Sequence, residues 1–242
     1  GFTYNKSTKN KISSIVVTHL YGSIGDMKKL IRLCKKYNLK LIEDAAEALG
    51  SFYNKKHAGT LGDVGILSFN GNKTITTGSG GAILLKSKSD RDKAEKLINI
   101  SKIKKKNYIT FDDIGYNYKI SNIQSAIGLA QMENLKKIIQ KKKKLNLEYK
   151  KEFKNYDYAD IFEAEKNCSS NYWINLLVLR KNYIHKRHYI EKKMRNSNIE
   201  IRSSWDLMHR LPHFSKNPKM KLNISTEINK KILYLPSSPK YA

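Results

Sequence analysis

Lys73 lies between two apolar runs and among small polar residues, within the segment Gly65–Leu85. The runs, Gly65–Phe69 and Gly81–Leu85, have the length and composition of buried strands. A lysine between two such strands either reaches solvent or is held where its charge is suppressed. A lysine amine that is kept uncharged is a nucleophile suited to Schiff-base chemistry. The local pattern alone favours an exposed hairpin lysine, so the catalytic interpretation needs support from other residues.

Two commoner phosphate-binding motifs are excluded by the spacing of this segment. A P-loop requires glycine directly before its Lys-Ser/Thr pair, and Asn72 occupies that position. A dinucleotide-binding fingerprint requires a third glycine three positions after the second. Counted from Gly80, that position is Ile83. The segment therefore matches neither motif.

Asp44 follows a predicted strand over Leu39–Glu43. An earlier β-branched run, Ile12–Val17, predicts another strand, and apolar residues at helical spacing predict a helix from Asp26 to about Asn38. Strand, helix and strand in this order form a βαβ unit with a parallel sheet. Ligands of such sheets bind at the carboxyl ends of the strands. Asp44 is therefore either a ligand-binding carboxylate or the N-cap of a short helix over Ala45–Leu49.

The composition is strongly basic, with 47 Lys and Arg against 21 Asp and Glu in 242 residues and a formal net charge of +26. The densest lysine runs fall in a predicted loop, Lys102–Thr110, and in a predicted helix, at Lys141–Lys144. No helix-turn-helix, zinc-finger or RNA-binding motif accompanies them, which makes nucleic acid an unlikely partner. Cys34 and Cys168 lack metal-ligand spacing, so no metal site is expected and they suit reduced thiols in the cytoplasm. No apolar run is long enough to span a membrane.

The rest of the chain predicts further helices and a second, smaller domain. One helix is expected from Ser87 or Ser89 to about Ser101, and another from Ser121 or Asn122 to about Phe153. The character of the sequence changes near residue 159. We therefore expect a large domain over residues 1–150 and a small α+β domain over 151–242. The elements expected in the small domain are a strand at Tyr172–Leu179, a helix at Ile184–Ser197 and a short strand at Ile199–Ile201.

The lysine segment resembles the active-site segment of the DegT/DnrJ/EryC1/StrS family of sugar aminotransferases. The resemblance rests on Ser68-Phe69 at a strand end, on Lys73, and on the turn Thr76–Gly81. It implies an α/β fold of the type I pyridoxal phosphate (PLP) transferases, with a mostly parallel sheet in three layers, here a partial large domain. The insert Asn70–Asn72 resembles the branch that aminates nucleotide-linked sugars in legionaminic-acid-type pathways.

The resemblance also implies roles for individual residues. Lys73 matches the Schiff-base lysine, and Asp44 matches the carboxylate that pairs with the pyridine nitrogen of PLP. The other implied cofactor contacts are Ser68 with the phosphate, Glu47 near the ring hydroxyl, and Asn117 with the phosphate of the partner subunit in a homodimer. Taken alone, Ser68 is a turn residue, and Arg202 is either a surface arginine or an anion contact. By resemblance, Arg202 belongs to a segment that lines the sugar-nucleotide site and contacts a substrate anion. His19 is interpreted as mainly structural.

The function implied is PLP-dependent transamination of a nucleotide-linked 4-keto-6-deoxy sugar, with glutamate as amino donor, for surface polysaccharide or glycan biosynthesis. The alternatives are a PLP-dependent sugar dehydratase or deoxygenase, a catalytically inactive fragment, and a basic binding protein. Lys73 argues against deoxygenation, because the deoxygenating relatives carry histidine there. The family also has a preceding segment and a short C-terminal tail that this sequence lacks, so we expect a fragment.

Overall fold

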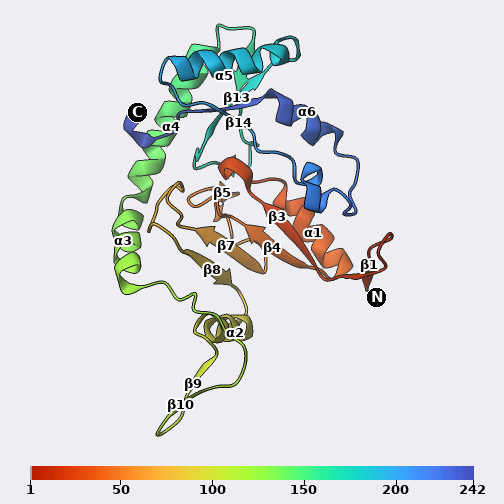
Figure 1. Ribbon diagram of the computed structural model, residues 1–242, viewed down its shortest axis with the longest axis vertical. Helices are drawn as coiled ribbons and strands as arrows, with labels where there is room; N and C mark the ends of the chain where they lie inside the picture. Colours follow the sequence, from red (N-terminus) through yellow and green to blue (C-terminus); the bar gives the residue numbers. More distant parts are fainter. Residues whose placement is uncertain (1) are drawn as a thin grey trace.

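The computed structural model describes residues 2–242, and at its centre lies a four-stranded sheet in the order β3-β4-β7-β8 (Figure 1). The strands β3 (Ser14–Thr18), β4 (Lys40–Asp44) and β7 (Val64–Ser68) are parallel, and β8 (Gly81–Leu85) is antiparallel to β7. The predicted mostly parallel sheet is confirmed. The parallel strands end at one edge, which therefore gathers Asp44 and Ser68.

The helix α1 (Met27–Tyr37) connects β3 to β4 as expected. Asp26 caps it by accepting a hydrogen bond from the backbone N–H of Lys29, and Asn38 ends it in the left-handed conformation, with φ of 50°. The helix packs on one face of the sheet around a core of buried residues that includes Ile24, Met27, Cys34, Leu41 and Leu67.

The opposite face of the sheet is open in the part of the chain that the structure describes. Val16, Ile66 and Ile83 are exposed there by 62 %, 40 % and 51 %. Side chains two apart on a strand share a face, so Asp44 and Ser68 lie on the same side as Val16 and Ile66. The candidate cofactor side of the sheet is therefore the side that residues 2–242 leave uncovered.

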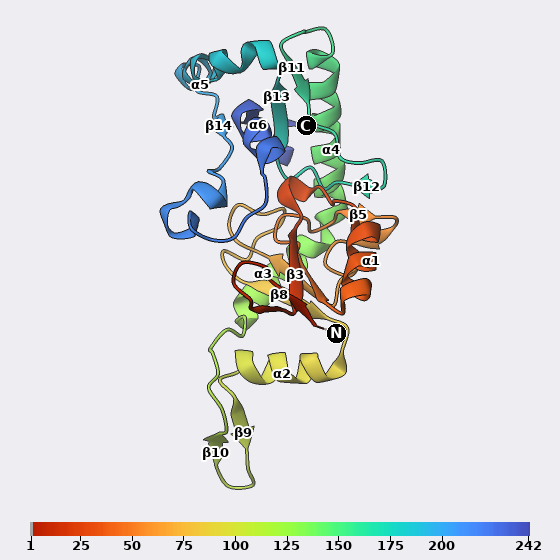
Figure 2. The ribbon, with the colours of Figure 1, turned by 90° about the vertical axis from the view of Figure 1, so that its right-hand side faces the viewer.

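The predicted basic loop at Lys102–Thr110 is wrong. The helix α2 (Lys88–Ile98) is followed by a hairpin of β9 (Lys102–Lys104) and β10 (Ile109–Phe111), paired antiparallel. This hairpin projects beyond α2, away from the rest of the molecule, in both views (Figures 1 and 2). Strand-forming residues lie among the lysines of this segment. Hydrogen bonds between β9 and β10 stabilise the hairpin despite its polar composition.

The single helix predicted to run to Phe153 is two helices, α3 (Asn122–Glu133) and α4 (Leu135–Phe153), which meet at Asn134. The side chain of Asn134 donates to the carbonyl of Ala130, a local bond that competes with helix continuation. The helix α4 contacts the core of the parallel sheet near its start and a second core near its end. The expected domain boundary at residue 150 falls inside α4, and the division stays a prediction.

The second sheet has the order β11-β13-β15-β14, with every pair antiparallel. Its strands are β11 (Ala159–Ile161), β13 (Asn175–Leu179), β15 (Ile232–Leu235) and β14 (Arg202–Ser203), and its helices are α5 (Arg187–Asn196) and α6 (Asn223–Lys231). The strand β13 and the helix α5 each begin three residues later than predicted, and the short strand predicted at Ile199–Ile201 lies at β14 instead. These shifts are errors of boundary, which short strands are prone to.

Short elements complete the chain. The strand β12 (Cys168–Ser169) pairs with β5 (Phe52–Tyr53), which pairs with β6 (Lys56–His57), so a late segment is hydrogen-bonded to an early one. The others are β1 (Thr3–Tyr4), β2 (Lys11–Ile12) and the 3-10 helices Leu20–Gly22, Lys181–Lys186, Met208–Arg210, Pro212–Phe214 and Pro239–Tyr241. Cys34 and Cys168 are free thiols. None of the helices within residues 2–242 is long and apolar enough to cross a lipid bilayer.

Candidate active site

Lys73 lies in the loop that follows β7, and its amine is enclosed. The backbone N–H of Lys73 donates to the carbonyl of Asn70 at 3.0 Å. The amine lies 3.7 Å from Oε1 of Glu47 and 4.4 Å from the ring centroid of Trp173. The side chain is only 14 % exposed. Lys73 is therefore not the solvent-exposed hairpin lysine that the local pattern favours, and its nearest neighbours attract a positive charge.

Glu47 lies in the turn after β4, and its carboxylate faces the Lys73 amine. Its Oε2 accepts a hydrogen bond of 2.8 Å from the backbone N–H of Tyr21. Burial raises the pKa of Glu47 above its ordinary value, against the lowering effects of the Tyr21 N–H and the Lys73 amine, and the charge of Asp44 raises it further. A carboxyl whose pKa is raised and which lies beside an amine can accept a proton from that amine and return it.

Asp44 is the last residue of β4, and Ser68 is the last residue of β7, the neighbouring parallel strand. Asp44 Oδ1 accepts a hydrogen bond from the N–H of Ala46 at 3.2 Å, and Ser68 Oγ accepts one from the N–H of Asn70 at 3.3 Å. Residues 45–49 form turns and irregular backbone, so the interpretation of Asp44 as the N-cap of a helix there is wrong. An amine (Lys73), two carboxylates (Asp44 and Glu47) and a hydroxyl (Ser68) thus lie at or just beyond the carboxyl ends of the parallel strands.

Asn117 lies elsewhere. It is exposed, and it pairs through its backbone with Asn99, just beyond the end of α2. Within residues 2–242 it makes no hydrogen bond with the side chains of Lys73, Asp44 or Ser68. Its expected contact with a partner subunit stays a prediction.

Arg202 lines the same cavity as Lys73, although it is 69 % exposed. Its guanidinium is paired with Glu200, with Nε 2.9 Å from Oε1. The cavity has a volume of about 510 Å³ and lies between the loop that carries Lys73, the helix α4 and the strands β14 and β15 of the second sheet. A substrate anion would therefore have to share Arg202 with Glu200.

Sequence reasoning missed an aromatic group around the lysine. Trp173 and Trp205 stack with their ring centroids 6.3 Å apart, and Tyr21 stacks on Trp205 at 5.9 Å. The hydroxyls of Tyr21 and Tyr234 are 2.7 Å apart. These residues come from four distant segments, so no spacing in the sequence signals the group. The positive φ of Tyr21, 59°, is equally invisible in the sequence.

A fully buried asparagine, Asn171, also went unnoticed. Its Nδ2 donates to the carbonyls of Glu47 and Leu49, at 2.9 Å each, and its backbone N–H donates to Ser51 Oγ at 2.9 Å. These bonds fix the turn that carries Glu47. A polar side chain that is fully buried and satisfied in this way holds two segments in one arrangement.

His19 and Glu43 form a buried pair behind the site. His19 Nε2 lies 2.9 Å from Glu43 Oε2, and both side chains are fully buried. Glu43 also accepts three backbone N–H groups, from Gly59 at 2.9 Å, from Leu61 at 2.7 Å and from Gly62. Burial opposes ionisation, but these hydrogen bonds lower the pKa of Glu43 below its ordinary value. This geometry agrees with the structural role expected for His19.

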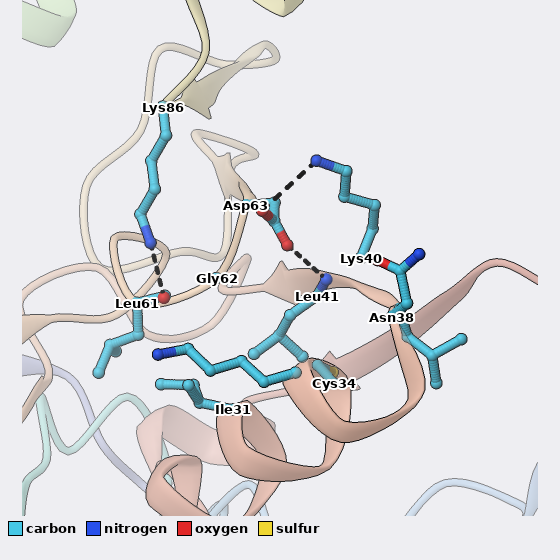
Figure 3. Close-up of a pocket in the computed structure, with 11 residues that line it drawn as sticks. Ile31, Cys34, Asn38, Lys40, Leu41, Leu61, Gly62, Asp63 and Lys86 are labelled. Carbon is cyan, nitrogen blue, oxygen red and sulfur yellow. Dashed lines mark hydrogen bonds and ion pairs between the residues drawn. The ribbon is translucent and has the colours of Figure 1, made fainter. Parts of the chain in front are cut away.

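Another cavity, of about 300 Å³, opens at the opposite ends of the strands (Figure 3). Three of the charged side chains that line it are already paired. Asp63 accepts the N–H of Leu41 at 2.8 Å and lies 3.7 Å from the Lys40 amine, and Lys86 donates to the carbonyl of Leu61 at 2.8 Å. Chemistry in parallel sheets occurs at the carboxyl ends, so the site at Lys73 is the stronger candidate.

Comparison with known proteins places this geometry in a family. The model of the DegT/DnrJ/EryC1/StrS aminotransferase family matches residues 5–242. The chain belongs to this family. Membership implies PLP as the cofactor and confirms the resemblance found in the sequence.

The similar proteins are sugar aminotransferases. The chain is 34 % identical over 230 residues to GDP-perosamine synthase of Escherichia coli O157:H7, covering 95 % of this chain and 62 % of that protein. It is 34 % identical over 236 residues to GDP-perosamine synthase of Vibrio cholerae, covering 97 % and 63 %. The chain thus spans less than two thirds of the length of these relatives.

Solved structures confirm the fold. Helicobacter pylori PseC, an aminotransferase involved in the biosynthesis of pseudoaminic acid, superposes with a TM-score of 0.90 at 22 % identity, covering 95 % of this chain and 62 % of that one. The α/β fold of the PLP-dependent sugar aminotransferases is therefore the fold of this chain.

Proposed function

We propose that this chain carries the catalytic core of a PLP-dependent nucleotide-sugar aminotransferase, with Lys73 as the lysine that binds the cofactor covalently. One observation carries the proposal. The Lys73 amine is enclosed 3.7 Å from Glu47, at the same sheet edge as Asp44 and Ser68. An enclosed amine at the carboxyl ends of parallel strands, with a carboxylate at Asp44 for the pyridine nitrogen, suits Schiff-base chemistry on PLP.

The residues present fit PLP. An enclosed amine suits the aldehyde, a carboxylate at Asp44 suits a protonated pyridine nitrogen, and the Ser68 hydroxyl suits a phosphate oxygen. When bound, PLP supplies the electron sink for breaking the bond between the α-carbon and its proton. Lys73 is positioned to move that proton, and Glu47 to exchange one with Lys73 at Oε1.

The proposed substrate is a nucleotide-linked 4-keto-6-deoxy sugar, and the proposed amino donor is glutamate. The names of the relatives support the sugar class, since they include the GDP-perosamine synthases and a UDP-4-amino-4,6-dideoxy-N-acetyl-beta-L-altrosamine transaminase of Campylobacter jejuni. The aromatic walls of the cavity suit a base or sugar ring, and the basic surface suits a diphosphate. The narrower likeness to the legionaminic-acid-type branch is part of this proposal.

We also propose an oligomeric state, a pathway and a cellular compartment for the chain. We expect a homodimer in which Asn117 contacts the cofactor phosphate of the partner, since Asn117 is exposed and far along the chain from the other site residues. The expected pathway is surface polysaccharide or glycan biosynthesis, and the expected compartment is the cytoplasm. Deoxygenation is the second candidate activity; the enclosed Lys73 argues against it.

Transfer of labelled nitrogen tests the activity. The chain is incubated with PLP, glutamate labelled with nitrogen-15 and a 4-keto nucleotide sugar, and the sugar is analysed by mass spectrometry. We expect label in the sugar, its loss in Lys73→Ala, and unchanged transfer in Lys137→Ala, which removes an exposed lysine of α4. Label that stays with glutamate for the unmodified chain, or transfer that survives Lys73→Ala, would refute the proposal.

A further inference from the structure

The helix α4 buries a lysine that has no carboxylate partner. Lys142 is 5 % exposed, and no ion pair in residues 2–242 includes it. It lies on the wall of the cavity that holds Lys73. Burial without a counter-charge disfavours the ammonium, which lowers the pKa of Lys142 to about 8. An uncompensated charge persists in a protein interior only where other contacts offset its cost.

The contacts of Lys142 are three backbone carbonyls from two separate segments. Its Nζ donates to the carbonyls of Trp173, at 3.2 Å, and Ser237, with a longer contact of 3.5 Å to Tyr172. The two segments lie on the cavity wall and are more than sixty residues apart in the sequence. An ammonium has three hydrogens, so Lys142 can bind both segments at once.

Neighbouring residues on the same face of α4 bind the same two segments. Asn146, one turn further on, donates to Asn175 Oδ1 at 2.8 Å, and Tyr149 donates to the carbonyl of Pro236 at 2.9 Å. Residues four and seven apart share one face of a helix, so these side chains form a row. Lys142 is the member of this row nearest to the loop that carries Lys73.

Trp173 links this row to Lys73. Its carbonyl accepts from Lys142, its indole Nε1 donates to the carbonyl of Asn72 at 2.8 Å, and its ring lies 4.4 Å from the Lys73 amine. A single residue thus receives a hydrogen bond from α4, holds the backbone directly before Lys73 and covers the amine. Any displacement of Trp173 would move or expose Lys73.

We propose that Lys142 is a positioning residue that holds Trp173 against Lys73 and thereby keeps the reactive amine enclosed. The catalytic importance of this contact rests on the function proposed above, but the contact itself does not. Lys142 touches no reacting atom; it acts through Trp173. A methionine of similar length would fill the space but leave the carbonyls unpaired, which explains a charged residue here.

Selective amine labelling of the chain without cofactor tests this inference. The chain is exposed briefly to an acylating reagent at several pH values, and the modification of each lysine is measured by peptide mass spectrometry. We expect Lys142→Met to increase the labelling rate of Lys73 by about fivefold or more, because released contacts of this size shift a local equilibrium by such a factor. Lys143→Met, on the exposed side of the same helix, is the matched control and should leave the rate unchanged.

Two further variants separate positioning from general loosening. Asn146→Ala weakens the same row without touching Trp173, and we expect it to leave Lys73 labelling nearly unchanged. Trp173→Phe removes the indole N–H, and we expect its effect and that of Lys142→Met to be non-additive in a double-mutant cycle. Equal effects of Lys142→Met and Asn146→Ala, or additive effects in the cycle, would overturn the inference.

The result is independent of cofactor binding. Faster labelling of Lys73 in Lys142→Met would support the positioning role even in a chain that fails to transfer nitrogen to a sugar. Unchanged labelling would refute the role even in a chain that performs the transfer. Restored protection in Lys142→Arg, which keeps charged donors at this position, would further support the inference, whereas Lys142→Arg labelled as fast as Lys142→Met would count against it.

Discussion

Raising the pH should stabilise the fold through Lys142. The ordinary pKa of a lysine is 10.5, and burial lowers that of Lys142 to about 8 in the folded chain. Above pH 10.5, the pKa of Lys142 in the unfolded chain, the amine is unprotonated in both the folded and the unfolded state. Between the two values the unfolded state holds a proton that the folded state lacks, so stability falls as the pH falls. Below the pKa of the folded chain both states are protonated, and burial of the ammonium lowers the free energy of unfolding by a constant amount, about 3 kcal/mol.

The measurement compares urea unfolding of the unmodified chain and of Lys142→Met, followed by tryptophan fluorescence. The other lysines titrate alike in both proteins, so their contributions cancel in the difference. Between about pH 7 and about pH 9.5 the unmodified chain should gain about 2 kcal/mol relative to Lys142→Met. Lys143→Met is the control, and the unmodified chain should gain no stability relative to it over the same pH range. Parallel stability profiles of Lys142→Met and the unmodified chain would refute the assignment of a charged, buried Lys142.

Two further predictions concern the buried polar groups behind the site. Glu43→Gln should lower the free energy of unfolding by about 3 kcal/mol, because it removes the charge that His19 and three backbone N–H groups share; Glu152→Gln, an exposed control, should change it little in the same urea titration. Burial lowers the pKa of His57, whose Nε2 accepts a backbone N–H, so stability should fall as the pH drops below its ordinary value of 6.5. His57→Gln should flatten that part of a thermal-unfolding pH profile, whereas His213→Gln, exposed, should not; an unchanged slope in His57→Gln would contradict this reasoning.

Much of the site was predictable because it depends on strand ends. Asp44 and Ser68 end two runs of apolar residues, and the rule for parallel sheets places such residues at one edge. The role of Lys73 was less predictable. Its local pattern suits an exposed hairpin, and only resemblance to a known family favoured an enclosed amine.

The enclosing contacts could not be predicted from the sequence. Trp173 and Asn171 reach Lys73 and Glu47 across about a hundred residues of chain, in a segment that reads as the start of a strand. Lys142 sits in a run of four lysines that predicts a solvated helix face, yet one of the four is buried. Helical position decides which lysine turns inward, and that depends on how α4 packs against both sheets.

Local structure also depended on competition that composition does not reveal. The lysine-rich segment at Lys102–Lys106 predicts a loop, but strand-forming neighbours pair it into a hairpin. At Asn134 a side-chain hydrogen bond to the preceding turn interrupts a helical pattern that appears continuous. In both cases a few specific hydrogen bonds determine the local structure, against the preference that the residue composition of the segment indicates.

Reductive trapping shows which lysine binds the cofactor covalently. The chain is incubated with PLP, reduced with borohydride and digested, and the modified peptide is sequenced by mass spectrometry. We expect PLP to become fixed to Lys73, Lys73→Arg to abolish this product, and Asp44→Asn to weaken the binding that precedes it. Fixation at Lys142, the other lysine of the cavity wall, or equal labelling of many surface lysines would contradict the claim that the Lys73 amine is the cofactor-binding nucleophile.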